Sequence, residues 1–174
     1  MKKFMIGLAV ACAAAVSQAA TVNWSLAGIT ASPNNAAAAG WVAYFLDGST
    51  IAEFNALAAD KVAAYAVSKA IDSGTTSSGR TGVQASHSYG NFSAGDSVSG
   101  YVVLFDASSA ASAKNYAVTG VINDKIPGAG NLNMSWAFST DTGNGWVSTA
   151  VPEPTTVALL ALGLAAVGLK RKLA

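Results

Sequence analysis

Residues 131–138 run Asn-Leu-Asn-Met-Ser-Trp-Ala-Phe, with a large apolar side chain at every second position. Successive side chains of a β-strand point to opposite faces, so this period of two predicts a strand with one buried and one solvated face. Residues 22–26, Val-Asn-Trp-Ser-Leu, show the same pattern. Half-buried strands are typical of antiparallel sheets, and we therefore expect a mainly β domain.

Other segments are apolar without alternation. Residues 41–46 and 101–105 are continuous apolar runs, which predicts central strands covered on both faces. A third segment, residues 116–122, is interrupted by a glycine. Residues 146–149 can form the last strand after a tight turn at Asn144-Gly145.

One helix is expected between these strands. Thr50 and Glu53 have the spacing of a capping box, in which each side chain bonds the backbone of the other residue. Apolar residues then recur at helical spacing on one face: Ile51, Phe54, Ala58, Val62 and Tyr65. Residues 75–88 are rich in Ser, Thr and Gly and predict a long loop.

These elements predict a small antiparallel β-sandwich with one inserted helix. The alternative is an α+β fold in which a single antiparallel sheet is covered by the helix. Residues 20–150 would form this domain, between a signal peptide and a C-terminal tail.

The first 19 residues are typical of a secretory signal peptide. Two lysines precede an apolar stretch at residues 4–16, and small residues follow it at Ser17 and Ala19. This pattern predicts cleavage between Ala19 and Ala20, and therefore export.

The single cysteine, Cys12, lies inside the predicted signal peptide. An alternative use of Cys12 as the modified residue of a lipoprotein stays open, although the residue three positions earlier is Ala9 rather than Leu. If the signal is cleaved before Ala20, the mature chain has no thiol. It can then form neither a disulfide nor a cysteine-based metal site.

The segment 151–174 has three parts. Pro152-Glu153-Pro154 comes first, and its prolines predict a stiff, extended backbone. Residues 157–169 are uncharged and predict a short apolar helix, below the roughly 20 residues that span a bilayer. Lys170, Arg171 and Lys172 then form a basic cluster, which the positive-inside tendency places in the cytoplasm with the domain outside.

This order of features resembles the PEP-CTERM sorting signal, and the resemblance is confined to residues 151–174. It implies recognition of Pro152-Glu153-Pro154 by an exosortase, a membrane-embedded transpeptidase-like enzyme of diderm bacteria that make exopolysaccharide. It also implies transient anchoring in the inner membrane, cleavage near this motif, and delivery to the cell surface or extracellular matrix. The alternative is an ordinary C-terminal anchor.

The charge of the domain argues against nucleic acid as a partner. The whole chain has 174 residues, of which 52% are hydrophobic and 11% charged. Residues 20–150 contain five lysines and arginines against eight carboxylates, a net charge of −3. A nucleic-acid interface needs a basic patch, and none is visible in this stretch.

Candidate catalytic groups are few. His87 is the only histidine, and one histidine without cysteine cannot build an ordinary zinc site. The tetrapeptide at residues 95–98, Gly-Asp-Ser-Val, resembles the nucleophile block of one esterase family. That family also needs a histidine near its C-terminus, and none follows His87, so Ser97 lacks a base. We expect a turn leading into a strand instead.

The carboxylates do not suggest a catalytic pair. A glycoside hydrolase needs two of them facing across a cleft, and most of those in the domain are expected at turns. The segment at residues 141–145 offers one carboxylate where a calcium loop needs several. The eight are Asp47, Glu53, Asp60, Asp72, Asp96, Asp106, Asp124 and Asp141. We expect no metal, no cofactor and no enzymatic activity.

The tryptophans allow two interpretations. Three of the four are in phase with apolar strand positions, which favours packing in the core; as a group they could instead form a stacking platform for sugar rings. They are Trp24, Trp41, Trp136 and Trp146. We therefore predict a non-catalytic surface or matrix protein associated with exopolysaccharide, or alternatively a carbohydrate-binding module displayed at the cell surface.

Overall fold

A computed structural model of the chain describes residues 20–29, 32–33, 39–77, 82–89, 92, 94–128, 130–138 and 145–149. Ala20, on one side of the predicted signal cleavage, begins the first strand. Other predicted features lie outside the described residues, so their geometry is not discussed: Cys12, Ala19, Asp141, Pro152, Glu153, Pro154, the helix at 157–169, Lys170, Arg171 and Lys172.

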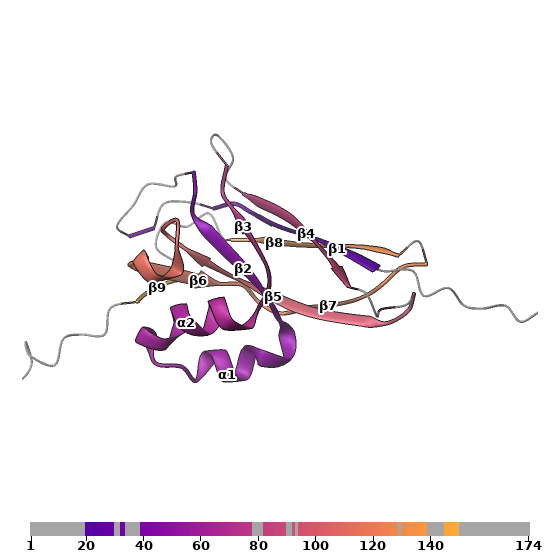
Figure 1. Cartoon of the computed structure of the whole chain (residues 1–174), viewed down its shortest axis with the longest axis horizontal. Coiled ribbons are helices and arrows are strands. Elements are labelled where there is room, and N and C mark those ends of the chain that lie inside the picture. Colours follow the sequence, from indigo (N-terminus) through magenta and orange to yellow (C-terminus); the bar gives the residue numbers. More distant parts are fainter. Residues whose placement is uncertain are drawn as a thin grey trace, which may run out of the picture.

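The described residues form two sheets and two short helices (Figure 1). The strands are β1 (Ala20–Ala27), β2 (Val42–Asp47), β3 (Ala70–Thr75), β4 (Val83–Tyr89), β5 (Ser97–Phe105), β6 (Asn115–Val118), β7 (Ile122–Lys125), β8 (Asn131–Ala137) and β9 (Trp146–Ser148).

The smaller sheet has the strand order β4-β1-β8. β1 pairs with β4 antiparallel but with β8 parallel. We expected antiparallel pairing throughout, and this one parallel pair differs. A parallel pair needs a long crossover connection, and almost the whole domain lies between these two strands in the sequence.

The larger sheet has the order β3-β2-β5-β6-β9, with β7 also pairing with β5, and all its pairs are antiparallel. β5 is long enough to pair with β7 along its first half and with β6 along its second half. The prediction of a mainly β fold with antiparallel strands is confirmed.

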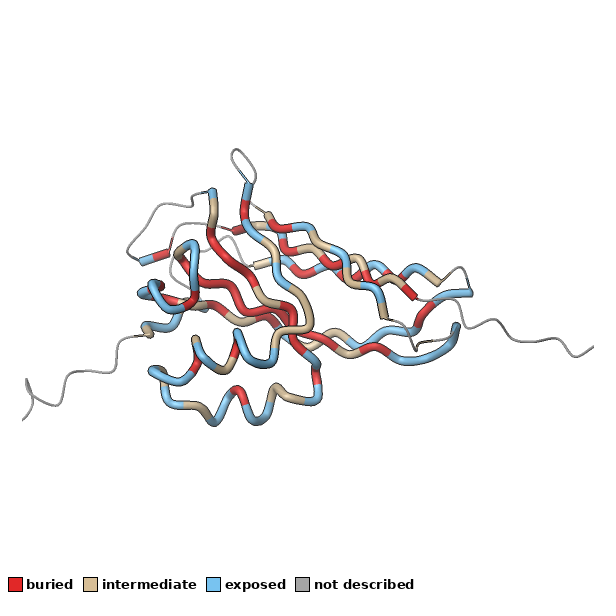
Figure 2. Tube along the Cα trace, in the orientation of Figure 1, coloured by how far each residue is buried: buried red, intermediate tan, exposed pale blue. Residues whose placement is uncertain are grey.

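Three layers explain the burial pattern (Figures 1 and 2). One apolar core fills the space between the two sheets, and a second lies between the larger sheet and the helices. Successive residues of β2 and β5 therefore enter different cores: Phe45 and Leu104 face the smaller sheet, whereas Leu46 and Phe105 face the helices. This double burial accounts for their continuous apolar sequences.

The helical segment is broken where one helix was predicted. A 3₁₀ turn at Gly48–Thr50 leads into α1 (Ile51–Asn55), and α2 (Ala59–Lys69) follows after a gap. Ala58, expected on the apolar face, is extended and exposed, and Ala66 is buried instead. A second 3₁₀ turn, η2 (Ala110–Ser112), packs near α2.

The predicted capping box is wrong. The Thr50 side chain makes no cap hydrogen bond; the Asp47 carboxylate instead accepts a hydrogen bond of 2.8 Å from the Ser49 amide. Glu53 accepts a hydrogen bond of 2.7 Å from the Tyr65 hydroxyl and so links α1 to α2.

Two further predictions need correction. Residues 75–88, expected as a loop, contain β4 and the end of β3. The last strand, expected to fold back after a turn at Asn144-Gly145, pairs with β6 in the other sheet and not with β8. Because the chain passes from the smaller sheet at β8 to the larger sheet at β9, the Trp146 ring meets Trp41 edge-on, with ring centroids 5.5 Å apart.

Replacing Gly100 by Ala should destabilise the sandwich by roughly 1–3 kcal/mol, because overpacking a filled core forces side chains to shift. A Cβ at Gly100 would overlap the buried Phe45 ring, which stacks on Trp24 at 5.9 Å. Gly128→Ala is the matched control, since a Cβ there meets nothing within 4 Å. Chemical denaturation measures both; equal stabilities would contradict the packing described.

Candidate functional site

Asp106 is the most buried charged residue described, with 2% of its surface exposed. Its Oδ1 accepts hydrogen bonds of 2.9 Å from the amides of Lys114 and Asn115. Its Oδ2 accepts from the Asn115 side-chain amide at 2.7 Å and from the Ser32 hydroxyl at 2.8 Å. One carboxylate thus ties the end of β5 to the start of β6 and to the segment before β2.

These contacts give Asp106 a structural role. Burial by itself would raise the pKa of Asp106, but the hydrogen bonds from Asn115, Ser32 and Lys114 outweigh it and hold the pKa below its ordinary value of 3.8. A carboxylate kept ionised by four donors is neither a general acid nor a free base. Asp106 was expected at a turn, and its network was not predicted.

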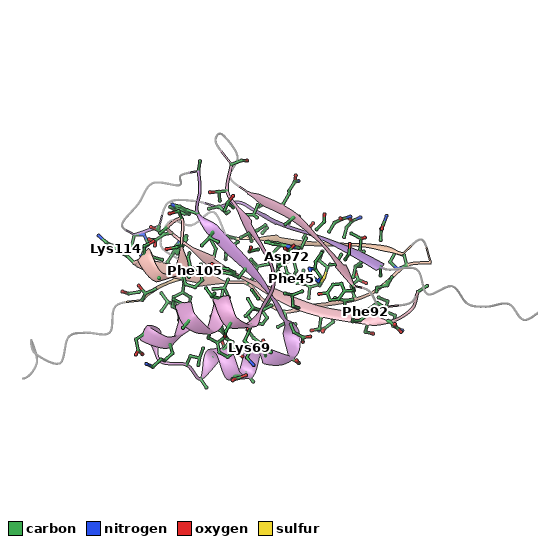
Figure 3. All side chains as sticks on the ribbon, viewed as in Figure 1. Phe45, Lys69, Asp72, Phe92, Phe105 and Lys114 are labelled. Atoms are coloured by element: carbon green, nitrogen blue, oxygen red, sulfur yellow. The ribbon has the colours of Figure 1, made fainter. Side chains whose placement is uncertain are left out.

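Most of the other described carboxylates bind nearby donors. The Asp72 carboxylate accepts a hydrogen bond of 2.8 Å from the Trp24 indole, which joins the two sheets. Asp72 lies on β3, the edge strand of the larger sheet, and is the register partner of Phe45 on β2 (Figure 3). Asp124 accepts from the Lys125 amide at 2.8 Å, and Asp60 lies 3.1 Å from Lys61. These groups hold local structure.

His87 and Ser97 stand in different sheets. His87, expected in a loop, lies in β4 opposite Val22, and its ring meets the edge of Tyr89 at 4.8 Å. Ser97 is the first residue of β5 and lies opposite Lys125. The expected turn at Gly95, followed by a strand, is present. Within the described residues, no group of three His, Cys, Asp or Glu side chains is placed to hold a metal ion.

The tryptophans pack in the interior. Trp24, Trp41 and Trp136 expose 1%, 4% and 6% of their surface, so they present no ring faces to solvent. The Trp136 indole donates a hydrogen bond of 2.9 Å to the Gly120 carbonyl. Trp146, in β9, is partly buried against Trp41. The core interpretation therefore holds for these three buried tryptophans, and a stacking platform built from all four is contradicted.

The end of the domain is fixed at Thr149, directly before the tail. The Thr149 amide donates a hydrogen bond of 2.9 Å to the Lys114 carbonyl, and its hydroxyl donates one of 2.7 Å to the Ala113 carbonyl. Lys114, labelled in Figure 3, directly precedes β6, and its amide also donates to the Asp106 carboxylate. Only residues 150 and 151 separate this anchor from Pro152.

A comparison with known protein families matches residues 150–172 to the PEP-CTERM protein-sorting motif. The chain carries a PEP-CTERM sorting motif. The match confirms the resemblance seen in the sequence, with its start one residue earlier and its end two residues earlier. Searches of curated proteins and of solved structures return no match.

The PEP-CTERM motif makes the chain an exported substrate of an exosortase, anchored transiently in a membrane before display at the surface. The motif begins one residue after Thr149, which two hydrogen bonds tie to the domain. Within the described part of the chain, no helix is long and apolar enough to cross a membrane.

Proposed function

We propose that residues 20–150 act as a non-catalytic structural protein of the cell surface or extracellular matrix of a diderm bacterium, in association with exopolysaccharide. The observation that carries this proposal is the PEP-CTERM motif placed directly after Thr149. A sorting signal that begins directly after the last residue tied to the domain supports the view that the domain itself is the delivered cargo.

The arrangement of ionisable groups supports a non-catalytic role. Catalysis by acid, base or nucleophile requires such groups to converge on a pocket with suitable pKa values. Here the carboxylates of Asp106 and Asp72 accept hydrogen bonds from donors that belong to the fold. Ser97 is exposed at the start of β5, in a different sheet from His87. Each buried side-chain nitrogen and oxygen among the described residues has a hydrogen-bond partner.

Co-fractionation tests this function. The full chain, expressed in a host with an exosortase, should purify with the exopolysaccharide, and the polymer's length should not change on incubation with the purified protein. A protein that washes off the polysaccharide completely would contradict the association. Shortening of the polymer that Ser97→Ala abolishes would contradict the non-catalytic role.

A second candidate function, a carbohydrate-binding module, is supported by one observation. It is not the tryptophans, which are buried. It is the outer face of the smaller sheet, whose solvated side chains are uncharged and, apart from Ala27 and Ala137, polar.

A further inference from the structure

Most of the solvated face of β4-β1-β8 is a grid of hydroxyl and carboxamide side chains, which we name the amide–hydroxyl face. The exposed Ala27 and Ala137 lie at one end of this grid. Each strand contributes every second residue, and the register aligns them in three rows across the sheet. The rows are Ser88, Thr21 and Asn131; Ser86, Asn23 and Asn133; and Gln84, Ser25 and Ser135. The inward residues of the same strands enter the core, so the fold fixes the grid (Figure 2).

Hydrogen bonds hold the middle of this face in place. The side-chain amide of Asn23 donates a hydrogen bond of 2.9 Å to the side-chain oxygen of Asn133. The Ser86 hydroxyl donates one of 2.8 Å to the side-chain oxygen of Asn23. The hydroxyls of Ser25 and Ser135 lie 2.9 Å apart. Side chains ordered in this way lose less conformational freedom when a ligand binds.

The amide–hydroxyl face carries no charge, although the domain does. β1, β4 and β8 contain no Asp, Glu, Lys or Arg, so the charges of residues 20–150 all lie elsewhere. Exposed sheets usually carry charged side chains, lysine above all, at their edges. Both β4 and β8 are edge strands of their sheet and lack them.

A shallow groove of about 380 Å³ lies over two of these rows. Its polar lining comes from Asn23, Ser25, Gln84, Ser86, Asn133 and Ser135. Carboxamides and hydroxyls both donate and accept hydrogen bonds, and polymer hydroxyls require both.

We propose that the amide–hydroxyl face binds a neutral polysaccharide chain along this groove. The inference rests on the proposed exopolysaccharide association and adds the site and the charge class of the polymer. Nucleic acid and anionic lipid need cations, and calcium needs carboxylates. Protein partners are anchored by aromatic and arginine side chains, which this face lacks. An uncharged hydrogen-bonding polymer is the occupant that matches its chemistry.

Affinity electrophoresis tests the proposal with the full-length chain in a polyoxyethylene detergent, which has no sugar head group. Gels contain hydroxyethyl cellulose, dextran or the host exopolysaccharide as probes, with polygalacturonate as the anionic comparison. The wild type should be retarded by at least one neutral polymer and more weakly by polygalacturonate. Because the face offers hydrogen bonds without aromatic stacking, retardation should depend on polymer length through repeated contacts.

Gln84→Glu/Asn133→Asp should weaken the retardation about tenfold, because two amide donors are lost and two charges must be desolvated. Asn133→Asp keeps an oxygen that can accept from Asn23. Asn55→Asp/Asn123→Asp adds the same charge at exposed sites on α1 and β7 and should bind as the wild type does. The single exposed change Gln84→Glu replaces the double variant if the latter melts earlier than its control.

Three outcomes would overturn the site. They are equal retardation of the double variant and the wild type, no retardation of the wild type by any neutral polymer, and a wild type that self-associates on size exclusion while the variant is monomeric. If the wild type still sediments with the host exopolysaccharide while its variants behave identically, the proposed function stands and only this site fails. If the wild type does not sediment with it, the proposed function fails.

Discussion

Asp106→Ala should lower the free energy of unfolding by about 3 kcal/mol, because four donors directed at the buried carboxylate lose their acceptor. For a domain of this size, the melting temperature should fall by roughly 10 °C. Thermal unfolding followed by circular dichroism measures the change. The loss should appear as a detached start of β6, since Lys114 and Asn115 both bond through this residue.

Asp124→Ala provides the control, because Asp124 is exposed and its side chain bonds only the Lys125 amide in the part of the chain described. It should change stability by less than about 0.5 kcal/mol.

The dependence of stability on acid pH gives a second check of the Asp106 network. The pKa of Asp106 is lowered in the folded state, so its stabilisation is complete above the unfolded value and disappears as pH falls through the folded value. The difference between wild type and Asp106→Ala should shrink below pH 3.8; an unchanged difference would contradict the network.

The sequence predicted those strands whose environment imposes a clear pattern. β1 and β8 alternate because one face meets the core and the other meets water, whereas β2 and β5 are continuous because both faces are covered. The sorting motif could also be recognised in the sequence, since it depends on the order of residues and not on tertiary contacts.

β4 was missed because its alternation is weak. Its inward residues are Val83, Ala85, His87 and Tyr89, of which only the first is a typical core residue, and serines lie between them. A search for register partners of β1, rather than for hydrophobicity, would have been needed. The break between α1 and α2 has no glycine or proline to signal it.

Contacts between residues far apart in the chain could not be predicted from the sequence. Nothing local in β1 and β8 indicates that they pair parallel, and the pairing aligns Asn23 with Asn133 across the whole domain. Asp106 looked like an ordinary residue after a strand, although its partners include Asn115 only nine positions away. The amide–hydroxyl face exists only through this pairing, so its parts could be seen in the sequence but not their assembly.

Replacing Pro152, Glu153 and Pro154 together by Ala should keep most of the protein in the membrane fraction with its tail intact. The sequence predicts that the prolines keep this segment extended, as a processing enzyme requires, and that alanine would favour helix in its place. Thr155→Ala/Thr156→Ala changes neighbouring positions without touching the motif and should be sorted normally. Fractionation and intact mass distinguish the processed chain from the retained one.

Deleting residues 152–174 separates sorting from anchoring. The truncated chain keeps Thr149 and its two hydrogen bonds, so the domain should fold, but it should be found in the soluble exported fraction. A shortened chain that melts far below the full-length protein would mean that the tail belongs to the domain.

Protease shaving of intact cells that contain an exosortase tests the central claim most directly. The wild-type chain should be accessible at the surface, and the variant with Pro152, Glu153 and Pro154 replaced by Ala should be protected. Equal accessibility of the two chains would contradict sorting by the PEP-CTERM motif.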